Sequence, residues 1–254
     1  MALKKRVRLK KKVKIFLLYV FLFTTLSISL LNIFLWGKDN KENNDVKKNI
    51  IKEVKMEVKD DEEETYIETD LRKLKEMNSD TVAWVYVPNT GINYPVLQTN
   101  DNDYYLNRSF YKQKNEAGWI FLDYRNSPEA TDKNTIVYGH NRLDGSMFGT
   151  LKRALNENWL RNNQYVYYNT LDTNNTYIIF SAYSINAEQF QTSTTFYSTK
   201  SYQSYLNTIK SRSILDLGID VTTDDKIITL YTCAYNNIDR TIVHAKLIQS
   251  IRAS

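Results

Sequence analysis

Near its C-terminus the chain reads KIITLYTCAYNNIDRTIVHAKLI over residues 226–248. Two runs rich in Ile, Thr, Tyr and Val, which favour strands, flank a polar connection short enough for an antiparallel hairpin. If Cys233 and Arg240 pair across this hairpin, their Cβ atoms lie about 4.5–5.5 Å apart on one face. The same register places His244 opposite Thr229. The stretch predicts two paired strands that bring a thiol beside a guanidinium.

Similar apolar runs recur upstream, separated by turn residues. With the two strands above they make about eight strands, which predicts a mostly β domain, a largely antiparallel barrel or sandwich. Two insertions have helical spacing, at residues 147–160 and 201–212, and Leu71, Leu74 and Met77 mark a short helix with Asp70 as its cap. The upstream strand runs are TVAWVYV, NYPVLQ, GWIFLDY, NTIVYGH, QYVYYNT and NTYIIFSAYSI.

The N-terminus predicts membrane attachment. Residues 1–14 hold eight Lys and Arg and no acidic residue, and residues 15–36 are 22 residues without a formal charge. A helix of that length is about 33 Å long, which spans a hydrocarbon core of about 30 Å. It is longer than the apolar region of a cleaved signal, about 7–15 residues, and no small-x-small cleavage site follows. We expect a basic cytoplasmic tail, an uncleaved transmembrane signal anchor at 15–36, and an extracellular remainder.

The remaining charge argues against a nucleic-acid partner. Residues 37–66 hold seven Lys and ten Asp and Glu, which predicts a solvated charged stalk, although Ile50, Val54 and Val58 have the spacing of a weak helix. Residues 67–254 hold 19 basic and 19 acidic groups. The net charge of +5 therefore belongs to the tail, and the outer domain has no basic bias.

The single cysteine limits the possible chemistry. It excludes an intramolecular disulfide and any multi-cysteine zinc site. Cys233 is either a small buried hydrophobic residue or a reactive thiol with a chemical role. An unpaired thiol in a chain that we expect to be exported favours the chemical role. Arg240 is either a surface cation paired with Asp239 or a group that holds a carbonyl oxygen or an oxyanion.

A cysteine nucleophile usually needs a proton carrier, and the chain has two histidines. In the assumed register, His244 lies about 13 Å along the strand from Arg240, which is too far. His140 ends the strand NTIVYGH where a loop begins, a common position for catalysis. His140 is therefore the candidate base.

These residues together resemble the sortase family of membrane-anchored cysteine transpeptidases. The resemblance rests on TLYTC ending at Cys233, the arginine at 240 and YGHN at His140. Class B sortases are favoured by WVYVPNTGINYPVLQTNDNDYYLN, GWIFLDYRN, YGHNRLDGSMF and the insertion before the final strands. The similarity covers residues 67–254, the expected catalytic domain.

The resemblance implies both a fold and a reaction. The fold is an eight-stranded sortase-type β-barrel with an N-terminal helical extension and a helix in the insertion before the last two strands. Cys233 would cleave a C-terminal sorting signal after Thr as a thioester, with His140 as general acid and base and Arg240 holding substrate and oxyanion. An amino group of the cell-wall peptide would then take over the acyl group. No metal or cofactor is implied, and Leu97, Tyr231 and Thr232 are the expected substrate-binding residues.

Two departures from the family pattern leave alternatives open. Class B members often have Ser two positions before the cysteine, where this chain has Tyr231, and the cysteine-to-arginine spacing is shorter than in some relatives. The alternatives are a pilin-polymerising sortase, a secreted cysteine peptidase that uses water, and a non-enzymatic membrane-tethered adhesin. The sequence does not choose between an NPQTN-like and a PxTG-like sorting signal.

Overall fold

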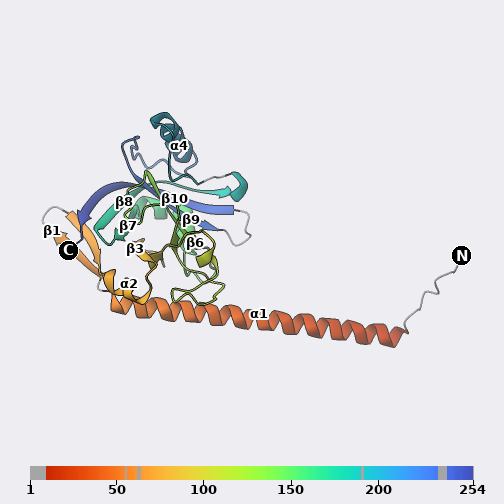
Figure 1. Cartoon of the computed structure of the whole chain (residues 1–254). Helices are drawn as coiled ribbons and strands as arrows, with labels where there is room; N and C mark the ends of the chain where they lie inside the picture. Colours follow the sequence, from red (N-terminus) through yellow and green to blue (C-terminus); the bar gives the residue numbers. More distant parts are fainter. Residues whose placement is uncertain (1–9, 55, 62–63, 190–191, 234–238, 254) are drawn as a thin grey trace.

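A computed structural model describes residues 10–54, 56–61, 64–189, 192–233 and 239–253. Eight of its strands form a closed barrel in the order β10-β8-β7-β3-β4-β5-β6-β9. Figure 1 shows this barrel with a long N-terminal helix extending away from it. Each barrel strand coincides with one of the eight runs predicted from sequence. The barrel strands are β3 (Thr81–Tyr86), β4 (Asn93–Leu97), β5 (Phe121–Leu122), β6 (Asn134–His140), β7 (Tyr165–Thr170), β8 (Thr173–Asn186), β9 (Ile227–Cys233) and β10 (Asp239–Arg252).

Strand pairing is antiparallel except at two places. β4 pairs with β5 and β6 pairs with β9 in parallel, and the other barrel pairs are antiparallel. The hairpin β9–β10 has the predicted register, with Arg240 opposite Cys233 and His244 opposite Thr229. The predictions of a mostly antiparallel barrel and of this register are confirmed.

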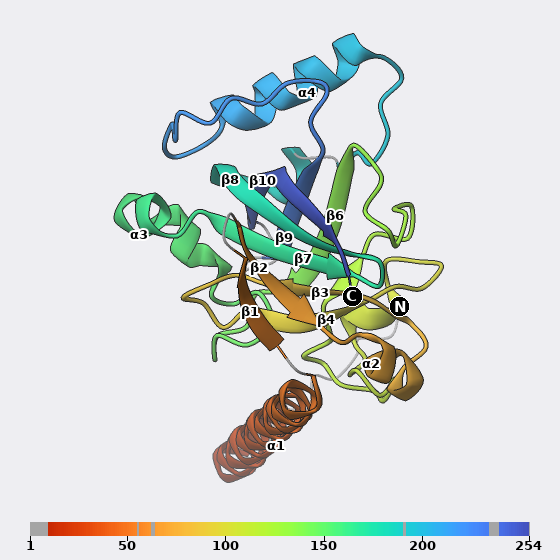
Figure 2. The ribbon, with the colours of Figure 1, turned by 90° about the vertical axis from the view of Figure 1, so that its left-hand side faces the viewer.

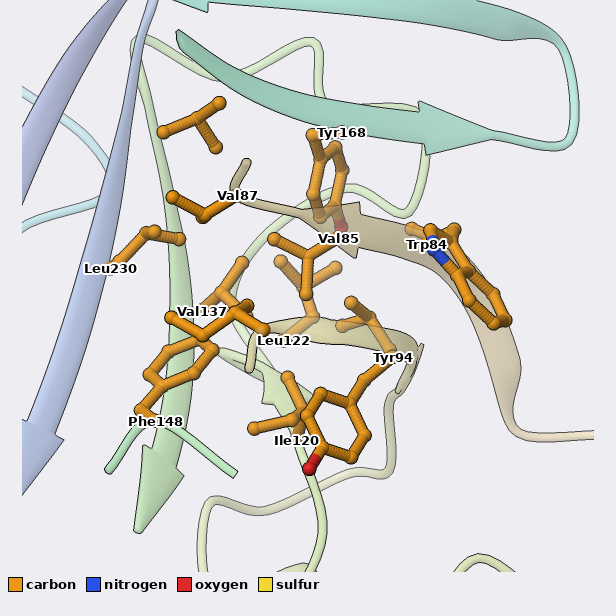
Figure 3. Packing of buried hydrophobic residues seen from close by; sticks show 14 of the residues in the cluster. Trp84, Val85, Val87, Tyr94, Ile120, Leu122, Val137, Phe148, Tyr168 and Leu230 are labelled. Carbon is orange, nitrogen blue, oxygen red and sulfur yellow. The ribbon is translucent and has the colours of Figure 1, made fainter. Parts of the chain in front are cut away.

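The barrel interior is filled by apolar side chains from most of the strands (Figure 3). Val85, Leu122, Val137, Tyr168 and Leu230 are each 0% exposed. Strands place successive side chains on opposite faces, so alternate residues of each strand point inward. This close packing fixes the strand ends, which makes them a rigid frame for a site.

Helices lie outside the barrel. The predicted short helix is α2 (Arg72–Met77), but its N-cap position is Leu71 and not the predicted Asp70. The Asp70 carboxylate still accepts a hydrogen bond from the Arg72 amide. α4 (Thr199–Ser211) forms the predicted helix before the last two strands and starts with a capping box of Ser198 and Ser201. It lies on the side of the barrel opposite α1 (Lys11–Glu53) (Figure 2).

The helix predicted over residues 147–160 is divided in two. A 3-10 helix, η2 (Leu151–Leu155), is followed by α3 (Glu157–Asn162). Asn156 separates them because its extended backbone interrupts the helix, while its side chain accepts a hydrogen bond from the Trp159 amide and caps α3. Two further 3-10 turns are η1 (Tyr104–Leu106) and η3 (Ala187–Gln189).

The segment expected to be a solvated stalk is largely structured. α1 runs without a break from the apolar segment through residue 53, and the hairpin of β1 (Met56–Asp61) and β2 (Glu64–Thr69) follows. We call residues 37–53 of α1 the stem. Asn43, Val46 and Ile50 of the stem, and Val54 after it, are buried against the barrel. The expectation missed this because charged residues occupy the exposed faces, while the buried residues recur every three or four positions.

Candidate active site

The ends of three strands bring the predicted site residues together. β6 and β9 are parallel and in register, so His140 lies beside Cys233. On the other side of β9, the antiparallel strand β10 places Arg240 beside Cys233. Cys233 thus occupies the position between the histidine and the arginine in one row of the sheet.

A cavity of about 230 Å³ opens at this end of the barrel. His140 and Arg240 both line it, and Tyr231 forms part of its wall. Tyr138 and Tyr231, each two residues before the end of its strand, meet edge to face with ring centroids 5.3 Å apart. The lining residues are Asn102, Leu106, Phe121, Tyr138, Gly139, His140, Tyr231 and Arg240.

The three expected substrate-binding residues occupy different places. Tyr231 lines the cavity. Thr232 is 1% exposed, because successive residues of a strand face opposite sides. Leu97 is fully buried and pairs with Phe121, a lining residue. Leu97 and Thr232 therefore lie among the buried residues rather than in the cavity wall.

His140 is held by a backbone oxygen. Its Nε2 donates a hydrogen bond to the Leu106 carbonyl at 2.7 Å, which leaves Nδ1 to exchange a proton. Burial lowers the pKa of His140, and the nearby Arg142 guanidinium lowers it further, while the Leu106 carbonyl and Glu116 act in the opposite direction. A half-buried imidazole that is neutral at physiological pH is suited to accept a proton.

A hydrogen-bonded carboxylate fixes the wall of the cavity. Asp123 Oδ2 accepts hydrogen bonds from the Tyr138 hydroxyl at 2.9 Å and from Asn102 Nδ2 at 3.2 Å. Burial acts to raise the pKa of Asp123, but hydrogen bonds from Arg125 and Tyr138 bring it below its usual value. The carboxylate is therefore ionised and holds two lining side chains.

Sequence reasoning missed most of the cavity wall. Tyr138 could have been found, because it lies two residues before His140 and therefore on the same face of its strand. Asn102 and Leu106 come from the connection between β4 and β5, and no local pattern indicates where that connection folds.

The second histidine lies inside the structure. His244 is 0% exposed. The Thr229 hydroxyl donates to Asn134 Oδ1, so it accepts from His244 Nδ1 at 2.8 Å, and His244 Nε2 accepts from the Tyr183 hydroxyl at 2.9 Å. Burial lowers the pKa of His244 to about 3, with the Arg212 charge as a smaller cause. His244 is a neutral core residue, separate from the cavity.

Comparisons with known proteins agree on one family. The sortase domain family matches residues 85–248. Sortase B of Listeria monocytogenes is 40% identical over 167 residues, covering 66% of this chain and 68% of the relative. Sortase B of Staphylococcus aureus is 33% identical over 192 residues, covering 72% and 77%.

Solved structures share the fold. Sortase B from Bacillus anthracis in complex with AAEK1 has a TM-score of 0.74 at 36% identity, covering 84% of this chain and 99% of that one. A Staphylococcus aureus sortase B–substrate complex has a TM-score of 0.67 at 33% identity, covering 70% and 84%. The eight-stranded barrel, its helical extension and the helix before the last two strands agree with these structures. The chain belongs to the sortase family of cysteine transpeptidases, and within it to class B.

Proposed function

We propose that Cys233 is the nucleophile of a sorting-signal transpeptidation in which His140 transfers protons and Arg240 holds the substrate oxygen. The observation that supports this most directly is the row of the sheet in which Cys233 lies between His140 and Arg240. The cavity lined by His140 and Arg240 gives the substrate a place to bind.

In the first half of the reaction, the Cys233 sulfur forms a bond with the backbone carbonyl carbon of the Thr in the sorting signal. The carbon–nitrogen bond of that peptide then breaks, leaving a thioester on Cys233. His140 supplies the proton that the departing amine needs, and the C-terminal fragment leaves. The proton comes from the thiol, so the half-reaction is balanced without a cofactor.

In the second half, an amino group of the cell-wall peptide attacks the thioester carbonyl. A new amide bond forms, the carbon–sulfur bond breaks, and His140 takes the proton of the attacking amine. The product is a surface protein joined to the wall, and Cys233 is free again. With a lysine of another protein subunit as acceptor, the same steps would polymerise pilins, and with water they would only hydrolyse the signal.

Arg240 stabilises the oxygen on which negative charge develops in both halves. A guanidinium has hydrogen-bond donors and no acceptor, so Arg240 can bind an oxyanion and cannot act as the base. Hydrogen-bond donors that are in place before charge develops lower the barrier, and removing one such donor typically costs about 10²–10³ in kcat.

We further propose that α1 anchors this enzyme in the cell membrane as a single-pass protein. Among the described residues, one helix is long and apolar enough to cross a bilayer, and its apolar part is not buried in the structure. The basic tail would remain in the cytoplasm and the barrel would face outward. There the barrel can meet exported proteins and the cell-wall acceptor.

The full chain in mild detergent tests these roles. We expect it to cleave a quenched peptide with an NPQTN-like or PxTG-like signal and to join the acyl fragment to an added amine. Cys233→Ala should abolish both reactions, and His140→Ala and Arg240→Ala should lower kcat at least about 100-fold. Arg252→Ala, which removes an exposed arginine from the same strand as Arg240, is the matched control and should keep full activity.

The outcomes separate the competing functions. Activity that survives Cys233→Ala would exclude the cysteine mechanism. Cleavage without incorporation of any amine would identify a peptidase. Incorporation of a pilin lysine in preference to a cell-wall peptide amine would favour pilus assembly, and folded protein that binds these peptides without cleaving any would favour the adhesin.

A further inference from the structure

The stem of α1 touches the backbone that surrounds His140. Asn43 is 2% exposed, although the stem on which it lies is rich in charged residues. Its Nδ2 donates hydrogen bonds to the Gly118 carbonyl at 3.0 Å and to Asn115 Oδ1 at 3.2 Å. A buried amide with two partners from one loop is a specific attachment of the helix to that loop.

The same loop is fixed to the stem at a second residue. Asn115 Nδ2 donates to the backbone oxygen of Asp39 at 3.2 Å, and the Glu116 amide donates to Asp39 Oδ2 at 3.1 Å. One turn of α1 separates Asp39 from Asn43, so residues 115–118 lie along a single face of the helix.

Gly118 connects this loop to the histidine. Its φ is +61°, and a Cβ added there would lie 2.8 Å from His140 Cδ2 and 2.6 Å from the Leu106 oxygen. That oxygen is the acceptor of His140 Nε2. The Gly118 backbone therefore packs against both the imidazole and the group that orients it, and glycine is needed for the close approach.

The chain beyond His140 is attached to the stem as well. Arg142 Nη2 donates to Asn40 Oδ1, and Arg142 Nη1 donates to the Glu116 carbonyl at 3.4 Å. The Arg142 guanidinium also lies 5.7 Å from the ring centroid of Trp36, at the end of the apolar segment. Backbone on both sides of the imidazole is thus held by the anchor helix.

We propose that Asn43 is a positioning residue for His140, so that the membrane anchor forms part of the frame of the active site. The inference rests on the proposed role of His140. Asn43 is not among the residues that line the cavity, and it acts through Gly118 and the Leu106 oxygen. A misplacement of about 1 Å in a catalytic group can cost about 10²-fold in rate, so the loss of one attachment is measurable.

The test compares four variants of the full chain in detergent or in vesicles. Asn43→Ala removes the attachment. Asn49→Ala is its matched control, because Asn49 is an exposed asparagine on the same helix. Lys47→Met weakens stem docking at contacts other than residues 115–118, because Lys47 Nζ donates to the Gly91 carbonyl and lies over the Tyr94 ring. His140→Ala reports the proposed function itself.

We expect Asn43→Ala to lower kcat, measured per folded enzyme molecule, about tenfold. KM should stay within about twofold of its value for the natural chain, because the substrate contacts are intact. Asn49→Ala and Lys47→Met should keep kcat, and thermal unfolding gives the folded fraction. If Asn43→Ala does not fold, Asn40→Ala replaces it and should lower kcat severalfold by releasing Arg142.

Two results would overturn the inference. One is a kcat for Asn43→Ala, or for its replacement Asn40→Ala, equal to that of Lys47→Met. The other is a rise in KM at constant kcat. If His140→Ala itself keeps its kcat, the proposed function is wrong, and the positioning role is excluded with it. If kcat falls in His140→Ala but not in Asn43→Ala, the proposed function stands and only the positioning role is excluded.

Discussion

At the scale of single residues, the two histidines show how surroundings decide a role. His140 ends β6 at the cavity, with one nitrogen fixed by a carbonyl and the other able to exchange a proton. His244 is enclosed by hydroxyl groups that satisfy both of its nitrogens in the neutral form. The same side chain is therefore a candidate catalyst in one place and a structural group in the other.

The burial of His244 predicts a pH-dependent stability. Its pKa is about 3 when folded and about 6.5 when unfolded, so only the unfolded chain binds this proton between those values. The stability that neutral His244 provides is complete above pH 6.5 and is lost as the pH falls toward 3, by about 1.4 kcal/mol per pH unit.

Thermal unfolding of the full chain between pH 4.5 and 7.5 measures this effect. We expect His244→Gln to be less stable than the natural chain at pH 7.5, with the difference narrowing as the pH falls. His140→Gln is the matched control. It should reduce the dependence of stability on pH by less than His244→Gln does, because His140 is only half-buried. Parallel curves for the natural chain and His244→Gln would contradict the assignment.

At the scale of elements, α1 joins an exposed apolar part and a docked stem in one helix. Its 43 residues make it about 65 Å long, and the apolar part is exposed while the stem packs on the barrel. The stem docks because Asn40, Asn43, Val46 and Ile50 lie on one face. Because α1 is continuous, its exposed apolar part is joined directly to the stem that packs on the barrel (Figure 1).

This docking predicts a stability cost for truncating the stem face. Ile50 is 0% exposed, and Ile50→Ala should lower the free energy of unfolding by about 2–5 kcal/mol through lost burial and a cavity. Ile51→Ala is the matched control, since Ile51 is only partly buried, and it should cost less than half as much. Equal losses at both positions, measured by thermal unfolding, would show that the stem is not docked through this face.

At the scale of the whole molecule, the distribution of charge predicts orientation in the membrane. The excess of positive charge lies before the apolar segment, and the barrel region has equal numbers of basic and acidic groups. Positively charged flanks are retained on the cytoplasmic side during insertion. The active site would then lie on the outer face, close to the stem.

Reporter fusions and thiol labelling check this orientation. A reporter at the N-terminus should be active only in the cytoplasm. Because Cys233 is the only thiol in the chain, a membrane-impermeant thiol reagent applied to intact cells should label the natural chain, recovered afterwards, and not its Cys233→Ala variant. Replacing the eight Lys and Arg of residues 1–14 by Gln should lower the correctly oriented fraction. Labelling that requires cell lysis would contradict the orientation.

The sequence alone predicted the strands and the three candidate groups of the site, because strand patterns are local properties of the chain. It allowed the pairing of Cys233 with Arg240 without fixing it, and the structure supplied that register. It also predicted a membrane anchor, since a long uncharged run next to a basic tail is a local signal. Tertiary structure decided which side chains line the cavity, why His244 is inert and where the stem lies. Those features depend on contacts such as Asn43 with Gly118, which are distant in sequence and have no periodicity that reveals them.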